Sequence, residues 1–185
     1  MDVLLKSALD WAAVLHKDQV RKYPERPDRP PVPYMSHIAG VALLLAREGF
    51  DDEVVAAGAL HDVVEDCGVS AAEIAARYGE RVAKLVTLVS EEDRSLPWED
   101  RKAAYLAKFA HEPWEAQAIT LADKTDNLRS IVVCARDYGD PWAMLKRGKA
   151  AQIERFDALL GMARALAPHP LVDHYARALD AARAV

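Results

Sequence analysis

The sequence has few cysteines and no long apolar run, and each absence excludes a class of protein. Its two cysteines, Cys67 and Cys134, are too few for the disulfide framework of a small secreted domain. The longest apolar stretches, such as residues 41–46, are far too short to span a bilayer. The N-terminal segment has no cationic start followed by an apolar core, so we expect no signal peptide. These absences predict a protein of the reducing cytoplasm that does not enter a membrane.

The length and net charge of the chain limit its possible fold and partners further. The chain has 185 residues, 51% of them hydrophobic, which is enough to bury the core of one domain. A net charge of −5 argues against a broad nucleic-acid-binding surface, although an acidic protein can bind an anionic nucleotide through a local cationic site. We therefore expect a small-molecule nucleotide partner and no nucleic acid. The oligomeric state is left open, and a homo-oligomer is possible.

Apolar residues recur at helical spacing through most of the chain, and no alternating strand pattern stands out. Residues 24–33 hold five of the ten prolines, so they cannot form a helix. Helices are predicted over residues 3–18, 70–79, 114–135, 141–166 and 171–184. The fold class is therefore all-α, a compact bundle of roughly nine or ten helices.

Short signals mark several helix starts. Ser36 can cap a helix whose first turn contains His37. Asp51 or Asp52 opens the helix that leads into the run LHDVVED, and Ser70 begins a capping box, Ser-Ala-Ala-Glu. Pro141, behind the cap candidate Asp140, predicts the start of a later helix.

The run LHDVVED places one imidazole and three carboxylates within six residues: His61, Asp62, Glu65 and Asp66. If the run is helical, His61 and Glu65 lie one turn apart on one face, and the two aspartates lie beside them. Such groups repel one another and resist burial unless a cation or protons offset their charge. An imidazole with hard oxygen donors suits a divalent ion such as manganese, iron or zinc.

A metal site needs ligands from several elements, because two adjacent side chains cannot close a coordination sphere. The candidate ligands are His37, His61, Asp62 and Asp123. Two imidazoles and two carboxylates leave room for water on a six-coordinate ion, which would make that water a nucleophile near neutral pH. Glu65 and Asp66 are then too many to be further ligands, and one of them would orient or deprotonate the water, or protonate a leaving oxygen.

Four separated segments carry a family resemblance: HKDQVRK (16–22), PYMSH (33–37), GALHDVVED (58–66) and LADKTDNLR (121–129). On these segments the chain resembles the hydrolase domain of the RelA/SpoT family, within the HD superfamily of metal-dependent phosphohydrolases. It is most similar to the stand-alone small alarmone hydrolases, including the short metazoan SpoT homologues. The likeness is strongest over residues 8–160, which makes residues 1–185 a single HD-type domain with a C-terminal helical extension over 161–185.

The resemblance implies a reaction and a metal. His37, His61, Asp62 and Asp123 match the family's metal ligands, and manganese is the usual ion, with iron, cobalt or zinc also possible. The implied reaction removes pyrophosphate from the 3′ position of ppGpp or pppGpp and yields GDP or GTP.

The resemblance also assigns roles to six other residues. Glu65 and Asp66 match the pair that activates the attacking water. Arg21 and Lys22 match a basic pair that contacts the nucleobase or phosphates, and Asn127 matches a nucleoside contact. The remaining match is Lys102, a weaker candidate for a phosphate or ribose contact.

Several departures from the family pattern leave the substrate open. The loop from Tyr23 to Val32 is longer and richer in proline, and Ile38 replaces the usual proline after the histidine. Thr125 and Asp126 replace an apolar residue and a His or Tyr. The same centre could therefore act on adenosine alarmones or remove the 2′-phosphate of NADPH. A hypothesis of another class is a non-catalytic module that senses a nucleotide.

Overall fold

The computed structural model describes residues 3–91, 97–145, 147–166 and 168–185, without the side chains of Trp98 and Lys102. Its described residues form ten helices and no strand, apart from two isolated β-bridges, which confirms the all-α expectation. The helices are α1 (Val3–Leu15), α2 (Met35–Arg47), α3 (Asp52–Ala59), α4 (Val63–Cys67), α5 (Ala71–Tyr78), α6 (Glu80–Val89), α7 (Trp98–Phe109), α8 (Trp114–Asp137), α9 (Gly148–Leu166) and α10 (Pro170–Arg183).

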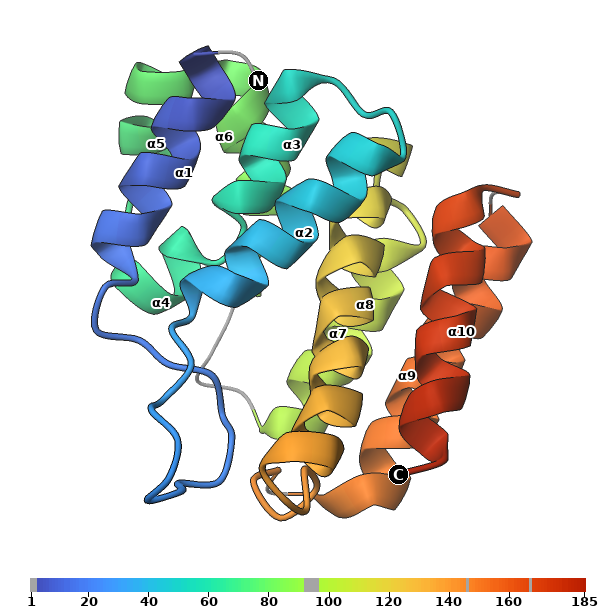
Figure 1. Cartoon of the computed structure of the whole chain (residues 1–185). Helices are drawn as coiled ribbons and strands as arrows, with labels where there is room; N and C mark the ends of the chain where they lie inside the picture. The colour runs from blue at the N-terminus through green and yellow to red at the C-terminus, as the bar shows by residue number, and fades with distance from the viewer. Residues whose placement is uncertain (1–2, 92–96, 146, 167) are drawn as a thin grey trace.

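The bundle is organised around α8, the longest helix, which packs against α2, α3, α6 and α10 (Figure 1). The first half of α8 is almost wholly buried, from Ala116 to Asp123, because the helices packed against it cover most of its surface. A helix that is apolar on most faces is typical of such a central position. In Figure 1, α1 to α6 lie on one side of α8, and α9 and α10 lie on the other.

Two of the expected helix caps are confirmed and two are wrong. Asp51 accepts a hydrogen bond from Val54 N, and Ser70 forms the capping box with Glu73. Ser36 caps nothing, since α2 begins at Met35 behind Tyr34 and has no side-chain cap. Asp140 binds the amide of Trp142, but this bond closes a turn, and α9 begins only at Gly148.

The run LHDVVED is not one continuous helix. The end of α3 is Ala59, α4 begins at Val63, and Leu60 to Asp62 form a tight turn between them. Val63 N binds Leu60 O at 3.1 Å, three residues back instead of four. The continuous helix on which a shared face for His61 and Glu65 depended is therefore absent from this run.

The proline-rich segment is a folded arm, and none of its residues is helical, as expected. Val20 and Pro33 pair at its base, where Arg21 N binds Val32 O, and Arg26 pairs with Arg29 at its tip. The arm leaves the bundle at lower left in Figure 1. Its base holds Arg21 beside the start of α2.

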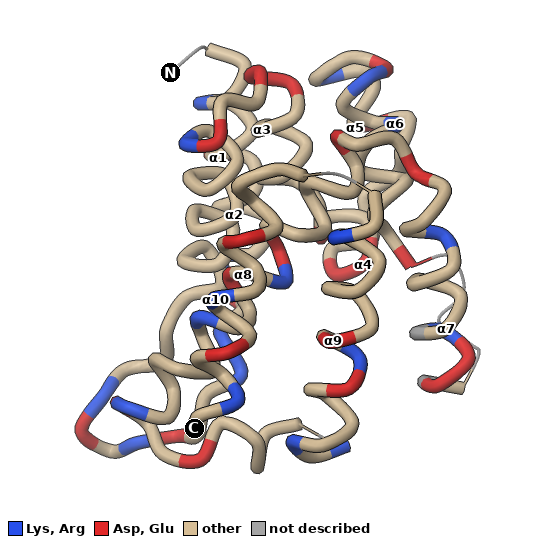
Figure 2. Tube along the Cα trace, turned by 90° about the vertical axis from the view of Figure 1, so that its right-hand side faces the viewer, with Lys and Arg blue, Asp and Glu red and all other residues tan. Residues whose placement is uncertain are grey.

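Charged residues of both signs are interspersed along the tube of Figure 2. A local concentration of cations must therefore come from the way the helices bring individual side chains together. In the described part of the chain, every helix is too short or too polar to cross a membrane.

Candidate metal centre and cleft

Three buried side chains from different parts of the chain meet at the middle of the bundle. His37 comes from the first turn of α2, His61 from the turn between α3 and α4, and Asp123 from the middle of α8. One donor atom of each lies within 4.8 Å of the others. The two Nε2 atoms are 3.3 Å apart, and Asp123 Oδ1 is 3.4 Å from Nε2 of His37.

The other ring nitrogen of each histidine is already engaged. Nδ1 of His37 lies 2.7 Å from Oδ2 of Asp126, and Nδ1 of His61 lies 2.8 Å from the carbonyl oxygen of Gly58. Both partners are acceptors, so each Nδ1 carries the proton. When the rings are neutral, their Nε2 lone pairs face one another and a carboxylate, an arrangement that a divalent cation stabilises.

Asp62 completes the donor set from the cleft side. Its Oδ2 lies 2.9 Å from Nε2 of His61 and 3.8 Å from Nε2 of His37. The hydroxyl group of Tyr34 donates a hydrogen bond to the same carboxylate oxygen. Burial, followed by the negative charge of Asp62, raises the pKa of Tyr34, so its hydroxyl remains a donor at neutral pH.

The electrostatics of the cluster favour positive charge. Burial lowers the pKa of His61, but the carboxylates of Asp62 and Asp123 outweigh this effect and raise it to about 9. Burial raises the pKa of Asp123, yet the ammonium group of Lys124 and the two imidazoles lower it well below its usual value. The carboxylate therefore stays ionised, and the cluster offers a charged oxygen and two imidazoles to a divalent ion.

The cluster opens into a cleft of about 860 Å³, within the size range of nucleotide and cofactor sites. His61, Asp62 and Asp123 line the cleft at the cluster. Six described cationic side chains line it as well: Arg21, Lys22, Arg101, Lys124, Arg147 and Arg155. These cations come from the arm, α7, α8, α9 and the segment before α9, so the fold gathers them from a chain whose net charge is negative.

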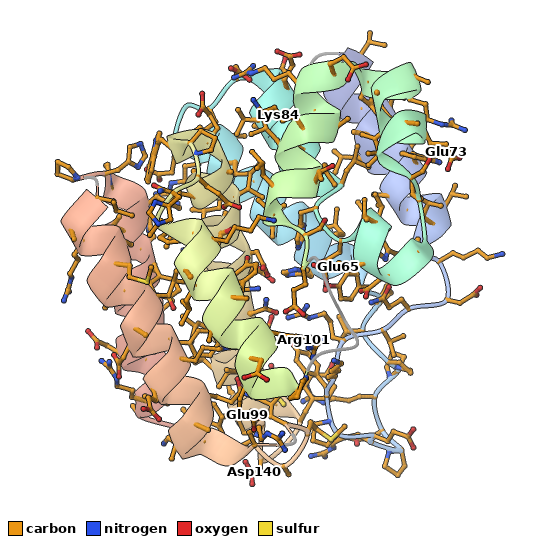
Figure 3. All side chains as sticks on the ribbon, turned by 180° about the vertical axis from the view of Figure 1, so that it is seen from behind. Glu65, Glu73, Lys84, Glu99, Arg101 and Asp140 are labelled. Carbon is orange, nitrogen blue, oxygen red and sulfur yellow. The ribbon has the colours of Figure 1, made fainter. Side chains whose placement is uncertain are left out.

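Glu65 and Asp66 both line the cleft next to His61 and Asp62, as the sequence predicts. Both belong to α4, which follows the turn that contains His61. Glu65 accepts a hydrogen bond from Glu91 N at 2.8 Å, and burial raises its pKa. Asp66 accepts one from the side-chain amide of Gln19 at 2.8 Å. Figure 3 shows Glu65 near Arg101, whose helix α7 forms another wall.

The expected substrate contacts also meet in the cleft. Arg21 donates from Nη2 to Asn127 Oδ1 and to Ser130 Oγ, each at 2.9 Å. Asn127 in turn donates to Oδ1 of Asp123, so its amide links the side chain of Arg21 to the cluster of His37, His61 and Asp123. Lys22 lines the same wall. The side chain of Lys102 lies outside the described residues.

Sequence reasoning missed several residues of the site. Tyr34 stands in the segment PYMSH, but nothing in the sequence pairs it with Asp62. His16 is buried and lies 2.7 Å from the side-chain oxygen of Gln19, which turns the amide of Gln19 toward Asp66. The segment HKDQVRK contains both, so the motif carried the signal although their contacts depend on the fold. Arg155 carried no comparable signal.

Comparison with known proteins places the chain in a family. The family model described as an HD domain matches residues 8–150. Over 132 residues the chain is 39% identical to guanosine-3′,5′-bis(diphosphate) 3′-pyrophosphohydrolase MESH1 of Homo sapiens, covering 70% of each chain. It is 38% identical over 133 residues to the MESH1 protein of Xenopus tropicalis, covering 71% of each.

Two solved structures share the fold. One is described as a metazoan ortholog of SpoT that hydrolyses ppGpp and plays a role in starvation responses. It superimposes with a TM-score of 0.82 at 27% identity, over 97% of this chain and 96% of the other. The second, from Listeria monocytogenes, has a TM-score of 0.71 at 38% identity, over 77% of this chain and 96% of the other.

Proposed function

The chain belongs to the HD domain family, and we propose that it hydrolyses the 3′-pyrophosphate of the guanosine alarmones ppGpp and pppGpp. The products would be pyrophosphate and GDP or GTP. The observation that carries the proposal is the buried cluster of His37, His61 and Asp123 beside a cleft lined by six cations. The relatives named for this activity, human MESH1 among them, match over more than two thirds of their length.

We propose that His37, His61, Asp62 and Asp123 hold one divalent ion, and that this ion is manganese. The donors are imidazole nitrogen and carboxylate oxygen, which suits manganese, iron, cobalt or zinc better than a thiolate-selective site would. A bound divalent ion would lower the pKa of a water molecule and polarise a phosphoryl oxygen.

The carboxylates of α4 supply the proton chemistry in this proposal. Glu65 takes a proton from the attacking water, and its raised pKa makes it a stronger base than an exposed glutamate. Asp66, held by Gln19, stands beside it and orients the water. The water oxygen bonds to the phosphorus attached to the 3′ oxygen, the bond from that phosphorus to the 3′ oxygen breaks, and the nucleoside oxygen receives a proton.

The cations of the cleft neutralise the phosphates of the substrate. Two hydrogen bonds fix the guanidinium group of Arg21, and its Cζ atom lies 5.7 Å from the centroid of the Tyr34 ring. A guanidinium group binds phosphate oxygens in pairs, whereas the ammonium group of Lys22 acts as a point charge. We assign Arg21, Lys22 and Asn127 to nucleotide binding and retain Lys102 as a weaker candidate.

The test is turnover by the purified chain against ppGpp, pppGpp, ppApp, pppApp and NADPH, with manganese present or removed by a chelator. We expect pyrophosphate release from the guanosine compounds that stops on chelation. Release from the adenosine compounds alone would change the base assignment, and release of single phosphate from NADPH alone would change the reaction. Nucleotide binding without any turnover would instead support the sensing module.

A further inference from the structure

Helices α2 and α8 approach each other through two matched pairs of residues. His37 and Gly40 lie three positions apart on α2, and Asp123 and Asp126 lie three positions apart on α8. Residues at this spacing share one helix face. His37 meets both aspartates, with Nε2 3.4 Å from Asp123 and Nδ1 2.7 Å from Asp126. The three atoms nearest to a Cβ at Gly40 all belong to Asp126.

The ring of His37 is clamped between these two carboxylates. Its side chain is 1% exposed and that of Asp126 is 16% exposed, so the contact lies largely away from solvent. A carboxylate that accepts the Nδ1 proton directs the Nε2 lone pair toward the cluster and makes that nitrogen a stronger ligand. Asp126 thus acts on the proposed metal centre without lying among its ligands.

Gly40 makes room for this carboxylate. A Cβ atom at position 40 would lie 2.1 Å from Oδ1 and 2.8 Å from Cγ of Asp126, far inside contact distance. The residue is inside α2 and has an ordinary helical backbone, where glycine is about 1 kcal/mol less favourable than alanine. Its presence there is explained by the close approach of the Asp126 side chain and by no turn or cap.

We propose that Asp126, seated against Gly40, is a positioning residue that fixes the tautomer and orientation of His37 for metal binding. The inference rests on the metal site of the proposed function and goes beyond it, since it concerns two residues that neither bind the ion nor touch the substrate. It also assigns a role to the departure at Asp126 that differs from a change in nucleotide preference.

The test is the dissociation constant for Mn²⁺, measured by calorimetric titration of the full chain after removal of metal. We expect Asp126→Ala to weaken binding about 10–100-fold. Asp126→Asn should weaken it less, because the amide oxygen still accepts the Nδ1 proton. Gly40→Ala should weaken it also, because the new methyl group displaces the carboxylate from His37.

The double variant isolates the contact between the two residues. If Gly40 acts only through Asp126, then Gly40→Ala adds no more than about twofold to the loss already caused by Asp126→Ala. Gly161→Ala is the matched glycine control, since a Cβ at that helical position has nothing within 4 Å. Asp137→Asn, at the far end of α8, is the control for a lost carboxylate. Both controls should retain the parent's affinity.

The Mn²⁺ titrations distinguish failure of the positioning role of Asp126 from failure of the proposed metal centre. A parent chain that binds no divalent ion would overturn the proposed metal centre. A parent that binds Mn²⁺ while Asp126→Ala binds it equally well would overturn only the positioning role. Losses from Gly40→Ala and Asp126→Ala that add in full would overturn the role of Gly40. The melting temperature of each metal-free variant identifies any loss that arises from unfolding.

Discussion

Glu65 and Asp66 are neighbours in the sequence, yet their surroundings differ. Burial raises the pKa of Glu65, while Asp66 is bound by the amide of Gln19 near the cleft surface. We expect Glu65→Gln to lower kcat about 10²–10⁴-fold, because the amide cannot accept a proton, while metal and nucleotide dissociation constants stay near those of the parent. Steady-state turnover and calorimetric titration measure the two effects.

The matched control for that substitution is Glu73→Gln. Glu73 belongs to the capping box at Ser70, where glutamine serves equally well, and Figure 3 places it far from Glu65. It should turn over substrate at the parent's rate. If Glu65→Gln did so too, Glu65 would have no role in proton transfer.

The pH dependence of turnover follows from the same residue. A general base must be ionised, so activity is lost as the pH falls through its pKa. Because burial raises the pKa of Glu65, the acidic limb of kcat/KM should lie above about 4.3, the ordinary value for glutamate. A pH–rate profile checks this expectation, and a limb at or below the ordinary value would contradict it.

Arg21 offers a test of substrate binding. We expect Arg21→Ala to raise KM for ppGpp more than it lowers kcat, because phosphate binding is needed before and during the reaction. Arg26→Ala, at the exposed tip of the same arm and paired only locally with Asp28, is the control and should change neither. An unchanged KM for Arg21→Ala would remove this residue from the binding site.

At the scale of elements, the sequence predicts those helix ends that local side chains determine. Asp51 and Ser70 cap helices through bonds to amides three residues ahead, so the pattern alone reveals them. The turn between α3 and α4 has no glycine or proline to announce it. It depends on the packing of Leu60 in the core and on the bond from His61 to Gly58 O, and both require the folded chain.

The residues of the site also fall into two groups: those that the sequence reveals and those that only the folded chain brings together. His37, His61, Asp62 and Asp123 are predicted as ligands because they stand in the segments PYMSH, GALHDVVED and LADKTDNLR, and the structure brings them together. The partners that orient them could not be found, since Asp126 meets His37 only after α2 packs on α8. Spacing within one helix is visible in a sequence, whereas the register of two helices is not.

The cap at Asp51 provides an element-scale prediction. Its carboxylate binds Val54 N and pairs with Arg81, and the bond to Arg81 holds the pKa of Asp51 below its usual value. Asp51→Ala should lower the free energy of unfolding by about 1 kcal/mol, and Asp51→Asn by less, because asparagine also caps. The effect of Asp51→Ala should shrink as the pH falls below about 4, because the unfolded chain takes up the proton first, and it should be lost once the pH falls below the lowered pKa of the folded chain. Urea unfolding measures all three, and equal losses in the two variants would contradict a capping role.

At the scale of the whole molecule, the cluster joins three parts of the chain that are far apart in sequence: α2, the turn before α4, and α8. An ion that binds only the folded chain should stabilise it by about 2.7 kcal/mol at one hundred times its dissociation constant. We therefore expect manganese to raise the melting temperature. His61→Ala should abolish that rise, whereas exposed His111→Ala should keep it. Calorimetry with and without the ion measures both, and a rise that survives in His61→Ala would place the ion elsewhere.

The family model ends near the start of α9, yet α9 contributes Gln152, Arg155 and Phe156 to the cleft, and α10 packs against α8. Helix α9 therefore takes part in the site, and α10 takes part in the bundle. That residues 1–185 act as a single domain stays a prediction. The cytoplasmic location and the oligomeric state stay predictions.

The spacing of residues along α8 has one more consequence. Asp123, Asn127, Ser130 and Cys134 follow one another along one face of this helix, and all line the cleft. Eleven residues of helix span about 16 Å. If the proposed reaction takes place at the cluster of His37, His61 and Asp123, the parts of the nucleotide farther from the reacting phosphorus would lie beside Asn127, Ser130 and Cys134 in turn. Substitutions at the distant positions would then change selectivity and leave the residues at the reacting bond unchanged.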